Sequence, residues 1–427
     1  MKLNYKRTFL VGLAFMSICA FWQLYDYVVP LILEYTFDFS ETVTGIVMAA
    51  DNVLAVFLLP LFGSLSDRAS TRLGKRTPFI LVGTFAAAVL MFIVPRADWA
   101  KNLPLFIVSL ALLLLAMATY RSPAVALMPD VTPKPLRSAG NAVINLMGAL
   151  GGIFTYLIIM FLLPEIDKTT RTKPAGYHTV FAIIGGFMVL AAIVLVLTIR
   201  ENKLAAEAAR YEGETEAATK GGRLAPEVRR SLGFILVSVA LWYIAYNAVS
   251  TVYSRYVLEV WNINEKTGSS MMLVATIVAT ISYIPIGILS SRFGRKKVIL
   301  FGVAIMTAAY LCGFVLTEYS PIIYAVMGVI GIGWASINVN SYPMVVEMSS
   351  GADVGKYTGI YYTFSMAAQI ITPILSGAII QAVGYRALFP YAVVFSAAAL
   401  FTMWQVHHGD SKPAAKKSVL ENFDTED

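Results

Sequence analysis

The chain has 427 residues, of which 58% are hydrophobic and only 14% are charged. A soluble domain of this length needs a more polar surface, so the composition excludes an ordinary soluble enzyme or binding module and indicates a membrane protein. The net charge of +7 does not point to nucleic acid, because the basic residues are scattered over the loops rather than gathered on one face.

Apolar runs of about 20 residues recur along nearly the whole chain, and each is long enough to cross roughly 30 Å of hydrocarbon as a helix. Lipid offers no hydrogen-bond partner to the backbone, so these runs must be helical. The sequence therefore predicts an all-α, multi-pass membrane protein with twelve spans. The spans are expected to begin near Thr8, Glu41, Thr77, Leu103, Arg137, Tyr177, Ser231, Glu265, Lys297, Pro321, Lys356 and Leu388.

A long polar segment from Arg200 to Arg230 separates two sets of six spans. We predict an N-terminal six-helix bundle over residues 1–199 and a partly helical cytoplasmic linker over 200–230. A C-terminal six-helix bundle over 231–408 and a disordered cytoplasmic tail over 409–427 follow. Most Lys and Arg residues fall on the side of the membrane that carries the N-terminus, which predicts a cell-membrane protein with both termini in the cytoplasm.

A charged loop recurs once in each half, as GSLSDRASTRLGKR at 63–76 and as GILSSRFGRKK at 287–297. The loop between the fourth and fifth spans of each half is also bracketed by an acid and then a base. These are Asp130 and Arg137 in the first half, and Glu347 and Lys356 in the second. Two six-helix repeats are typical of the major-facilitator plan, in which substrate is held between the halves near the midplane. We expect the inner-loop charges to pair when the inner side closes.

The segments from Gly63 to Leu81 and from Ser122 to Asp130, followed by RSAGN at 137–141, resemble a known signature. They are similar to the inner loops of sucrose/proton symporters and of glycoside-pentoside-hexuronide:cation symporters, both branches of the major facilitators. The resemblance covers most of the N-terminal half and weakens in the second half. It implies that Asp67, Arg68 and Asp130 are gate and fold elements rather than sugar ligands. With the repeat, the expected cytoplasmic gate comprises Asp67, Arg68, Arg76, Asp130, Arg137, Arg292, Glu347 and Lys356.

The fourth span departs from the pattern of plant sucrose carriers. Leu114 stands where that family has an Asp, and Val125 stands where it has an Arg. Arg121 lies about one turn before Val125 on the same helical face, so it can offer its charge to the same cavity. The usual coupling acid is therefore absent, and the resemblance does not decide between proton and sodium coupling.

Three ionisable residues lie inside the first half's spans: Asp26, Asp51 and Arg121. Each isolated charge near the bilayer centre costs about 3 kcal/mol on insertion scales, so the group needs a reason to be there. One interpretation is a wet coupling site that takes up a proton or a cation, with Asp51 as first choice because it is nearest its span's centre. The alternative is a structural ion pair that joins helices. Arg255 and Glu259, four residues apart, are expected to pair or to reach the interface.

Polar and aromatic side chains form stripes on several spans. Amides can donate and accept hydrogen bonds while aromatic rings pack on the C–H face of a sugar, so the stripes favour a hydroxyl-rich ligand. Each stripe alone also fits ordinary helix packing. The candidate substrate-binding residues are Trp22, Gln23, Asn141, Asn145, Tyr243, Tyr246, Asn247, Tyr362 and Gln369.

The sequence thus predicts a secondary active transporter that takes up a small glycoside, such as a disaccharide, by alternating access. Proton or sodium ion is the expected coupling ion, with no other cofactor, and sugar and lipid are the expected partners of a monomer. A major-facilitator exporter of another small molecule is the alternative, while the duplicated gate disfavours a channel. An intramembrane enzyme is disfavoured because no nucleophile and base come together, and an ATP-driven pump because no phosphate-binding loop is present.

Overall fold

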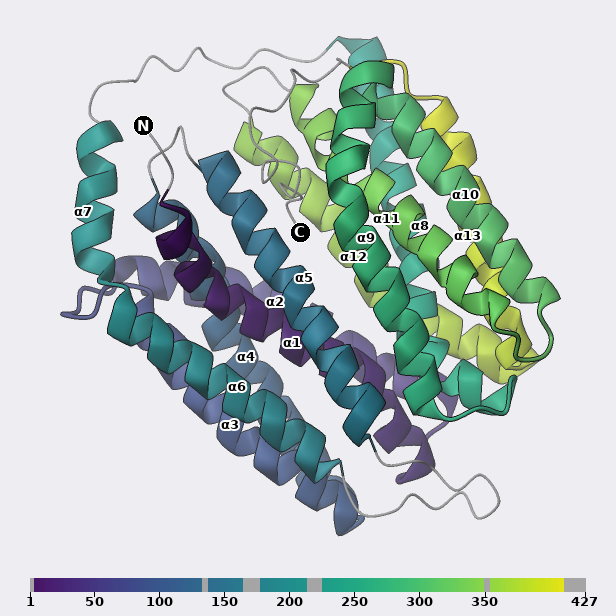
Figure 1. Cartoon of the computed structure of the whole chain (residues 1–427), viewed down its shortest axis with the longest axis horizontal. Helices are drawn as coiled ribbons and strands as arrows, with labels where there is room; N and C mark the ends of the chain where they lie inside the picture. Colours follow the sequence, from purple (N-terminus) through teal and green to yellow (C-terminus); the bar gives the residue numbers. More distant parts are fainter. Residues whose placement is uncertain (1–3, 133–136, 164–176, 213–224, 349–353, 411–427) are drawn as a thin grey trace. The chain divides into compact units, whose positions relative to one another are not determined.

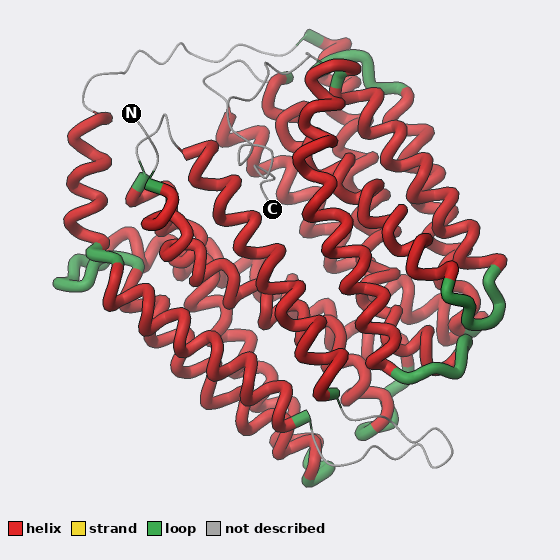
Figure 2. The backbone as a smooth tube through the Cα atoms, in the orientation of Figure 1, coloured by secondary structure: helices red, strands yellow, loops and turns green. Residues whose placement is uncertain are grey.

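The structure is a computed structural model, and it describes residues 4–132, 137–163, 177–212, 225–348 and 354–410. The regular elements in this part of the chain are all helices (Figures 1 and 2). Twelve of them are long and apolar enough to cross a membrane. The predicted fold class and the predicted number of spans are confirmed.

The first six spanning helices begin close to their predicted starts. Asn102 caps α4 by accepting a hydrogen bond from the Leu105 N–H at 3.1 Å, and Pro104 occupies the first turn, where its missing N–H costs nothing. Asn4 caps α1 in the same way through the N–H of Arg7. The helices are α1 (Tyr5–Tyr35), α2 (Glu41–Arg68), α3 (Thr77–Trp99), α4 (Leu103–Val131), α5 (Arg137–Leu162) and α6 (His178–Thr198).

A short polar helix, α7 (Glu201–Glu212), lies within the predicted linker. The second set of spanning helices follows. These are α8 (Pro226–Glu259), α9 (Glu265–Phe293), α10 (Arg295–Val315), α11 (Ile322–Glu347), α12 (Val354–Val383) and α13 (Leu388–Trp404), with a single 3-10 turn, η2 (Tyr385–Ala387), before the last.

The chain forms two compact units. The first comprises Met1–Phe39, Ala50–Thr215 and Asn264–Ser270, and the second comprises Ser40–Ala49, Glu216–Ile263 and Met271–Asp427. Two helices are therefore divided, since the first turns of α2 belong to the second unit and the first turns of α9 belong to the first.

The same set of helix pairs packs inside each unit. In the first unit α1 packs against α4, α5 and α6, and α3 packs against α4 and α6. In the second unit α8 packs against α11, α12 and α13, and α10 packs against α11 and α13. Five helices of the first set, α1, α3, α4, α5 and α6, thus have counterparts with matching neighbours, namely α8, α10, α11, α12 and α13. This correspondence is expected of a duplicated unit.

Glycines allow corresponding helices to approach closely in both units. A Cβ atom on Gly83 of α3 would lie 2.6 Å from the Cβ of Tyr120 on α4. At the equivalent crossing, a Cβ atom on Gly302 of α10 would overlap the Cβ of Ser336 on α11. Small residues at helix crossings let backbones pack where burial from water provides no driving force.

Arg255, near the C-terminal end of α8, is buried inside the second unit. Its side chain is only 3% exposed, and its Nη1 pairs with the carboxylate of Glu41 in the first turn of α2. The Tyr385 hydroxyl donates to the other oxygen of the same carboxylate. Arg255 is therefore neutralised by an acid that is distant in the sequence.

Candidate functional site

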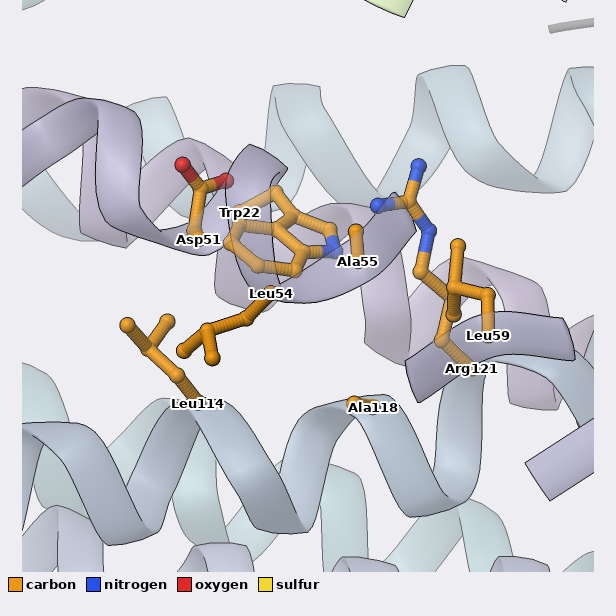
Figure 3. Close-up of a pocket in the computed structure, with 8 residues that line it drawn as sticks. All are labelled: Trp22, Asp51, Leu54, Ala55, Leu59, Leu114, Ala118 and Arg121. Atoms are coloured by element: carbon orange, nitrogen blue, oxygen red, sulfur yellow. The ribbon is translucent and has the colours of Figure 1, made fainter. Parts of the chain in front are cut away.

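A hollow in the first unit brings together residues from α1, α2 and α4 (Figure 3). The hollow is partly open, and its space of about 250 Å³ includes the opening outside the protein. Its polar lining consists of Trp22, Asp51 and Arg121, all predicted site residues. Its apolar wall consists of Leu54, Ala55, Leu59, Leu114 and Ala118.

Two of the three predicted coupling residues, Asp51 and Arg121, therefore line one hollow. Asp26 is absent from its lining, but its carboxyl interacts electrostatically with both Asp51 and Arg121. The three charges form one local group within the first unit. Ionised side chains cost less free energy within a membrane where they line a hollow than where they face lipid.

The charges in this group are near one another without being paired. Among the described residues no ion pair joins Arg121 to either acid. The carboxylate of Asp51 instead accepts a hydrogen bond of 2.8 Å from the Asn52 amide. The guanidinium of Arg121 lies over the ring of Trp22, 5.4 Å from its centroid, as a cation–π contact.

In the second unit, the predicted residues of α8 meet a tryptophan that the sequence analysis missed. The ring of Tyr246 stacks on Trp334 of α11 with centroids 3.7 Å apart, and Tyr243 meets the same indole edge to face at 5.3 Å. The Nδ2 of Asn247 is buried and has no hydrogen-bond partner. Trp334 stands between Gly333 and Ala335 in the sequence. A single large aromatic residue between two small residues is a feature of the sequence from which Trp334 could have been predicted.

The other predicted substrate-binding residues lie on several helices. The Gln23 amide donates to the Tyr156 hydroxyl at 2.7 Å, so it is partly satisfied within the bundle. Tyr362 belongs to an aromatic cluster on α11 and α12, and Asn145 and Gln369 are half-buried on α5 and α12. The side chain of Asn141 lies outside the described residues.

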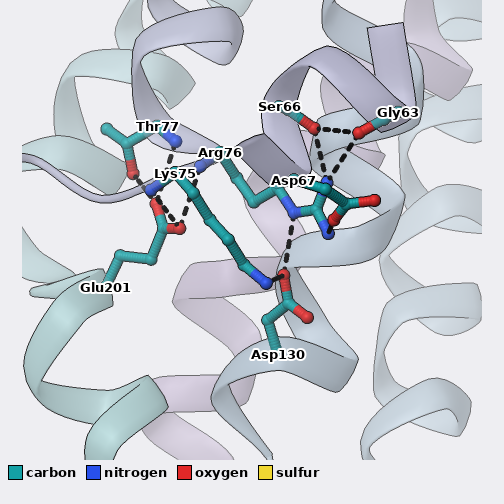
Figure 4. Close-up of polar contacts among 8 residues, drawn as sticks. All are labelled: Gly63, Ser66, Asp67, Lys75, Arg76, Thr77, Asp130 and Glu201. Atoms are coloured by element: carbon teal, nitrogen blue, oxygen red, sulfur yellow. Dashed lines mark hydrogen bonds and ion pairs between the residues drawn. The ribbon is translucent and has the colours of Figure 1, made fainter. Parts of the chain in front are cut away.

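The charged loop of the first unit folds around Arg76 (Figure 4). This side chain is 5% exposed, and its Nε donates to Asp130 Oδ2 at 2.8 Å. The same guanidinium contacts Asp67 and the Ser66 hydroxyl, and it donates to the Gly63 carbonyl at 3.3 Å. Three predicted gate residues, Asp67, Arg76 and Asp130, are thus brought together.

Glu201 joins this cluster from the first residue of α7. Its carboxylate accepts the backbone N–H groups of Lys75, Arg76 and Thr77 at 2.8–2.9 Å and the Thr77 hydroxyl at 2.7 Å. It thereby caps the N-terminus of α3, where a negative charge is favoured by the helix dipole. The sequence does not single out Glu201, because it follows α6 by only a few residues and resembles any other acid of the linker.

The second unit repeats this arrangement with a different acid. Gly74 and Gly294 both adopt positive φ angles, +124° and +90°. Lys75 and Arg76 follow Gly74 and precede α3, and Arg295 follows Gly294 as the first residue of α10. In the second unit Asp410 accepts the Lys296 N–H at 2.8 Å. The described structure therefore extends to residue 410, beyond the predicted start of the tail.

The remaining gate predictions find less support. Arg68 and Arg292 are exposed at the ends of α2 and α9. The side chains of Arg137, Glu347 and Lys356 lie outside the described residues. Within the described ranges, no group of three His, Cys, Asp or Glu residues could hold a metal ion.

The chain belongs to the MFS/sugar transport protein family, whose model matches residues 12–404. This membership confirms the predicted relationship to the major facilitators. The relatives are transporters rather than enzymes, in agreement with the predicted absence of enzymatic activity.

Individual proteins show how far the similarity extends. The chain is 31% identical over 207 residues to human solute carrier family 45 member 3, covering 45% of this chain and 35% of that protein. It is 27% identical over 336 residues to the glucuronide carrier protein homolog of Escherichia coli K12, covering 75% and 68%. The crystal structure of a mutant of the nucleoside transporter NupG matches with a TM-score of 0.67 at 15% identity over 94% of this chain and 99% of that one. At that identity the structural match shows the fold alone.

Proposed function

We propose that this protein is a secondary active transporter of the cell membrane that takes up a small glycoside, such as a disaccharide, by alternating access. A proton or a sodium ion drives the uptake, both termini face the cytoplasm, and the protein works as a monomer. The observation that carries the proposal is the hollow of the first unit, where Asp51 and Arg121 stand beside Trp22 within membrane-spanning helices. Family membership and the names of relatives, including a glucuronide carrier homolog, support a sugar derivative as cargo.

Asp51 is the proposed coupling acid, with Asp26 and Arg121 modulating its charge. A carboxylate that is accessible from a hollow and not bound to a base can gain a proton or a cation when the hollow faces one side and lose it when the hollow faces the other. Trp22 in the first unit and Tyr243, Tyr246 and Trp334 in the second are the proposed aromatic contacts of the cargo, since sugars pack well on aromatic faces.

Uptake of labelled glycosides into proteoliposomes tests this proposal under an imposed pH gradient, sodium gradient or neither. We expect one gradient to drive accumulation of at least one sugar above equilibrium. Asp51→Asn should abolish accumulation while leaving exchange of internal for external sugar, because the driving ion no longer binds. Glu259→Gln removes a carboxylate that does not line the hollow, so it serves as the control. Accumulation by Asp51→Asn equal to wild type would remove Asp51 from the coupling site.

An exporter of an amphipathic small molecule is the second candidate, and the apolar wall of the hollow favours it. Five of the eight lining residues are Leu or Ala. Inverted vesicles that accumulate an amphipathic compound, together with no sugar accumulation under either gradient, would support this candidate instead.

The cluster around Arg76 is the proposed cytoplasmic gate. A buried guanidinium shared by Asp67 and Asp130 has a well-defined paired state that a conformational change can break and reform. Arg76→Gln should slow the turnover rate with sugar affinity largely kept, whereas the exposed Arg68→Gln should have a smaller effect. A selective loss of sugar binding in Arg76→Gln would contradict the gate assignment.

A further inference from the structure

Trp22 occupies an unusual position among the charges of the hollow. Its indole lies between the carboxylate of Asp51 and the guanidinium of Arg121 (Figure 3). All three side chains line the same hollow, and the guanidinium rests over the ring at 5.4 Å from its centroid. The ring therefore separates two opposite charges that the low polarity of the surroundings would otherwise draw together.

The separation of these two residues matters for transport. A carboxylate bound to Arg121 would already be neutralised, and it would have no need of a second cation. Kept apart from Arg121, Asp51 retains the amide hydrogen bond from Asn52 and can take up an ion. The cation–π contact meanwhile compensates part of the charge on Arg121 without consuming the acid.

A second observation concerns hydrogen-bond donors. The Nε1 of Trp22 is buried and has no partner, although a buried donor that lacks an acceptor is costly. Arg121, a side chain with five N–H donors, lines the same space. The Trp22 N–H and the Arg121 guanidinium are both donors, so an oxygen atom of a bound ligand would supply an acceptor for them.

We propose that Trp22 is a positioning residue that holds Asp51 and Arg121 apart so that Asp51 can bind the driving ion, and that its N–H donates to an oxygen of the bound glycoside. This inference rests on the proposed function. It assigns two separable roles to one side chain, since the ring provides the separation and the N–H provides the hydrogen bond.

Substitutions at Trp22 distinguish the two roles. Trp22→Phe keeps an aromatic ring and loses the donor, so the apparent KM for sugar should rise about fivefold, the effect of one hydrogen bond, with gradient-driven accumulation retained. Trp22→Ala removes the ring, so Asp51 and Arg121 can pair. Accumulation should then be lost while exchange continues at a raised KM, because the N–H donor is lost as well. Trp22→Leu gives the same test if the alanine variant does not fold.

Two further variants make the test specific. Adding Arg121→Gln to Trp22→Ala removes the base that captures Asp51, and it should restore part of the accumulation. A general packing defect would not be rescued in this way. Trp242→Phe is the matched control, because the indole N–H of Trp242 is also buried without a partner but Trp242 does not line the hollow. Its KM and accumulation should equal those of the wild type.

KM, accumulation and exchange are measured in proteoliposomes with the sugar that the wild-type protein exchanges. Retained accumulation in both Trp22→Ala and Trp22→Leu, or no rescue by Arg121→Gln, would overturn the separating role. An unchanged KM in Trp22→Phe would overturn the donor role. Failure of the wild-type protein to exchange any glycoside would instead overturn the proposed function, so the two failures are distinguishable.

Discussion

Removing the carboxylate of Glu201 should destabilise the protein although this residue lies in a polar linker helix. Glu201 is 2% exposed and accepts three backbone N–H groups of the α3 N-terminus. In Glu201→Ala these donors lose their acceptor, at about 1 kcal/mol each at the lower end of the usual range. Loss of the negative charge at the helix N-terminus adds roughly 0.5–1 kcal/mol. The total is about 3–4 kcal/mol of unfolding free energy.

Thermal unfolding of the purified protein in detergent measures this loss. Glu207→Ala is the matched control from the same helix, because its side chain is 46% exposed and pairs with Arg7 at 3.5 Å. An exposed pair of this kind contributes less than about 1 kcal/mol. Glu201→Ala should melt several degrees below Glu207→Ala. Limited proteolysis should also cut its linker faster, since the contacts of Glu201 that hold α7 at the start of α3 would be lost. Equal melting temperatures and equal cleavage rates for the two variants would refute the reasoning.

Two further predictions concern backbone strain and a buried ion pair. Gly74→Ala should lower the melting temperature, because φ is +124° there and the added Cβ would overlap a carboxylate oxygen of Glu201. Gly186→Ala, where a Cβ meets nothing within 4 Å, is the control, and equal melting of the two would contradict the prediction. Arg255→Ala leaves the carboxylate of Glu41 without its cation and should cost about 3–5 kcal/mol of unfolding free energy, measured by the same assay. Exchanging the two charges in Glu41→Arg with Arg255→Glu should recover part of the loss, and no recovery would show that the pair itself is not the cause.

The sequence determined the class of protein, the twelve spans and the repeat. Span length and apolar composition follow directly from the thickness of the bilayer. Helices were therefore expected to begin near Glu41, Thr77 and Leu103, and α2, α3 and α4 begin at these residues. The sequence also singled out Asp51 and Arg121, because ionisable groups stand out against an apolar background. Each of these features can be recognised within a single span, without knowing how the spans pack together.

Only the tertiary structure decided which side chains meet. The hollow places Trp22 beside Asp51 and Arg121, whereas Asp26 is absent from its lining. Arg255 found its partner in Glu41, 214 positions away. Helix periodicity specifies which residues share a face of one helix, but it carries no information about which helix packs against that face.

The same limit explains Glu201, whose hydrogen-bond partners lie 124 to 126 positions away. Nothing in the linker distinguishes this acid from its neighbours until α7 docks at the start of α3. The pairing of charges depends on how the helices pack together, and that packing depends on contacts spread over the whole unit.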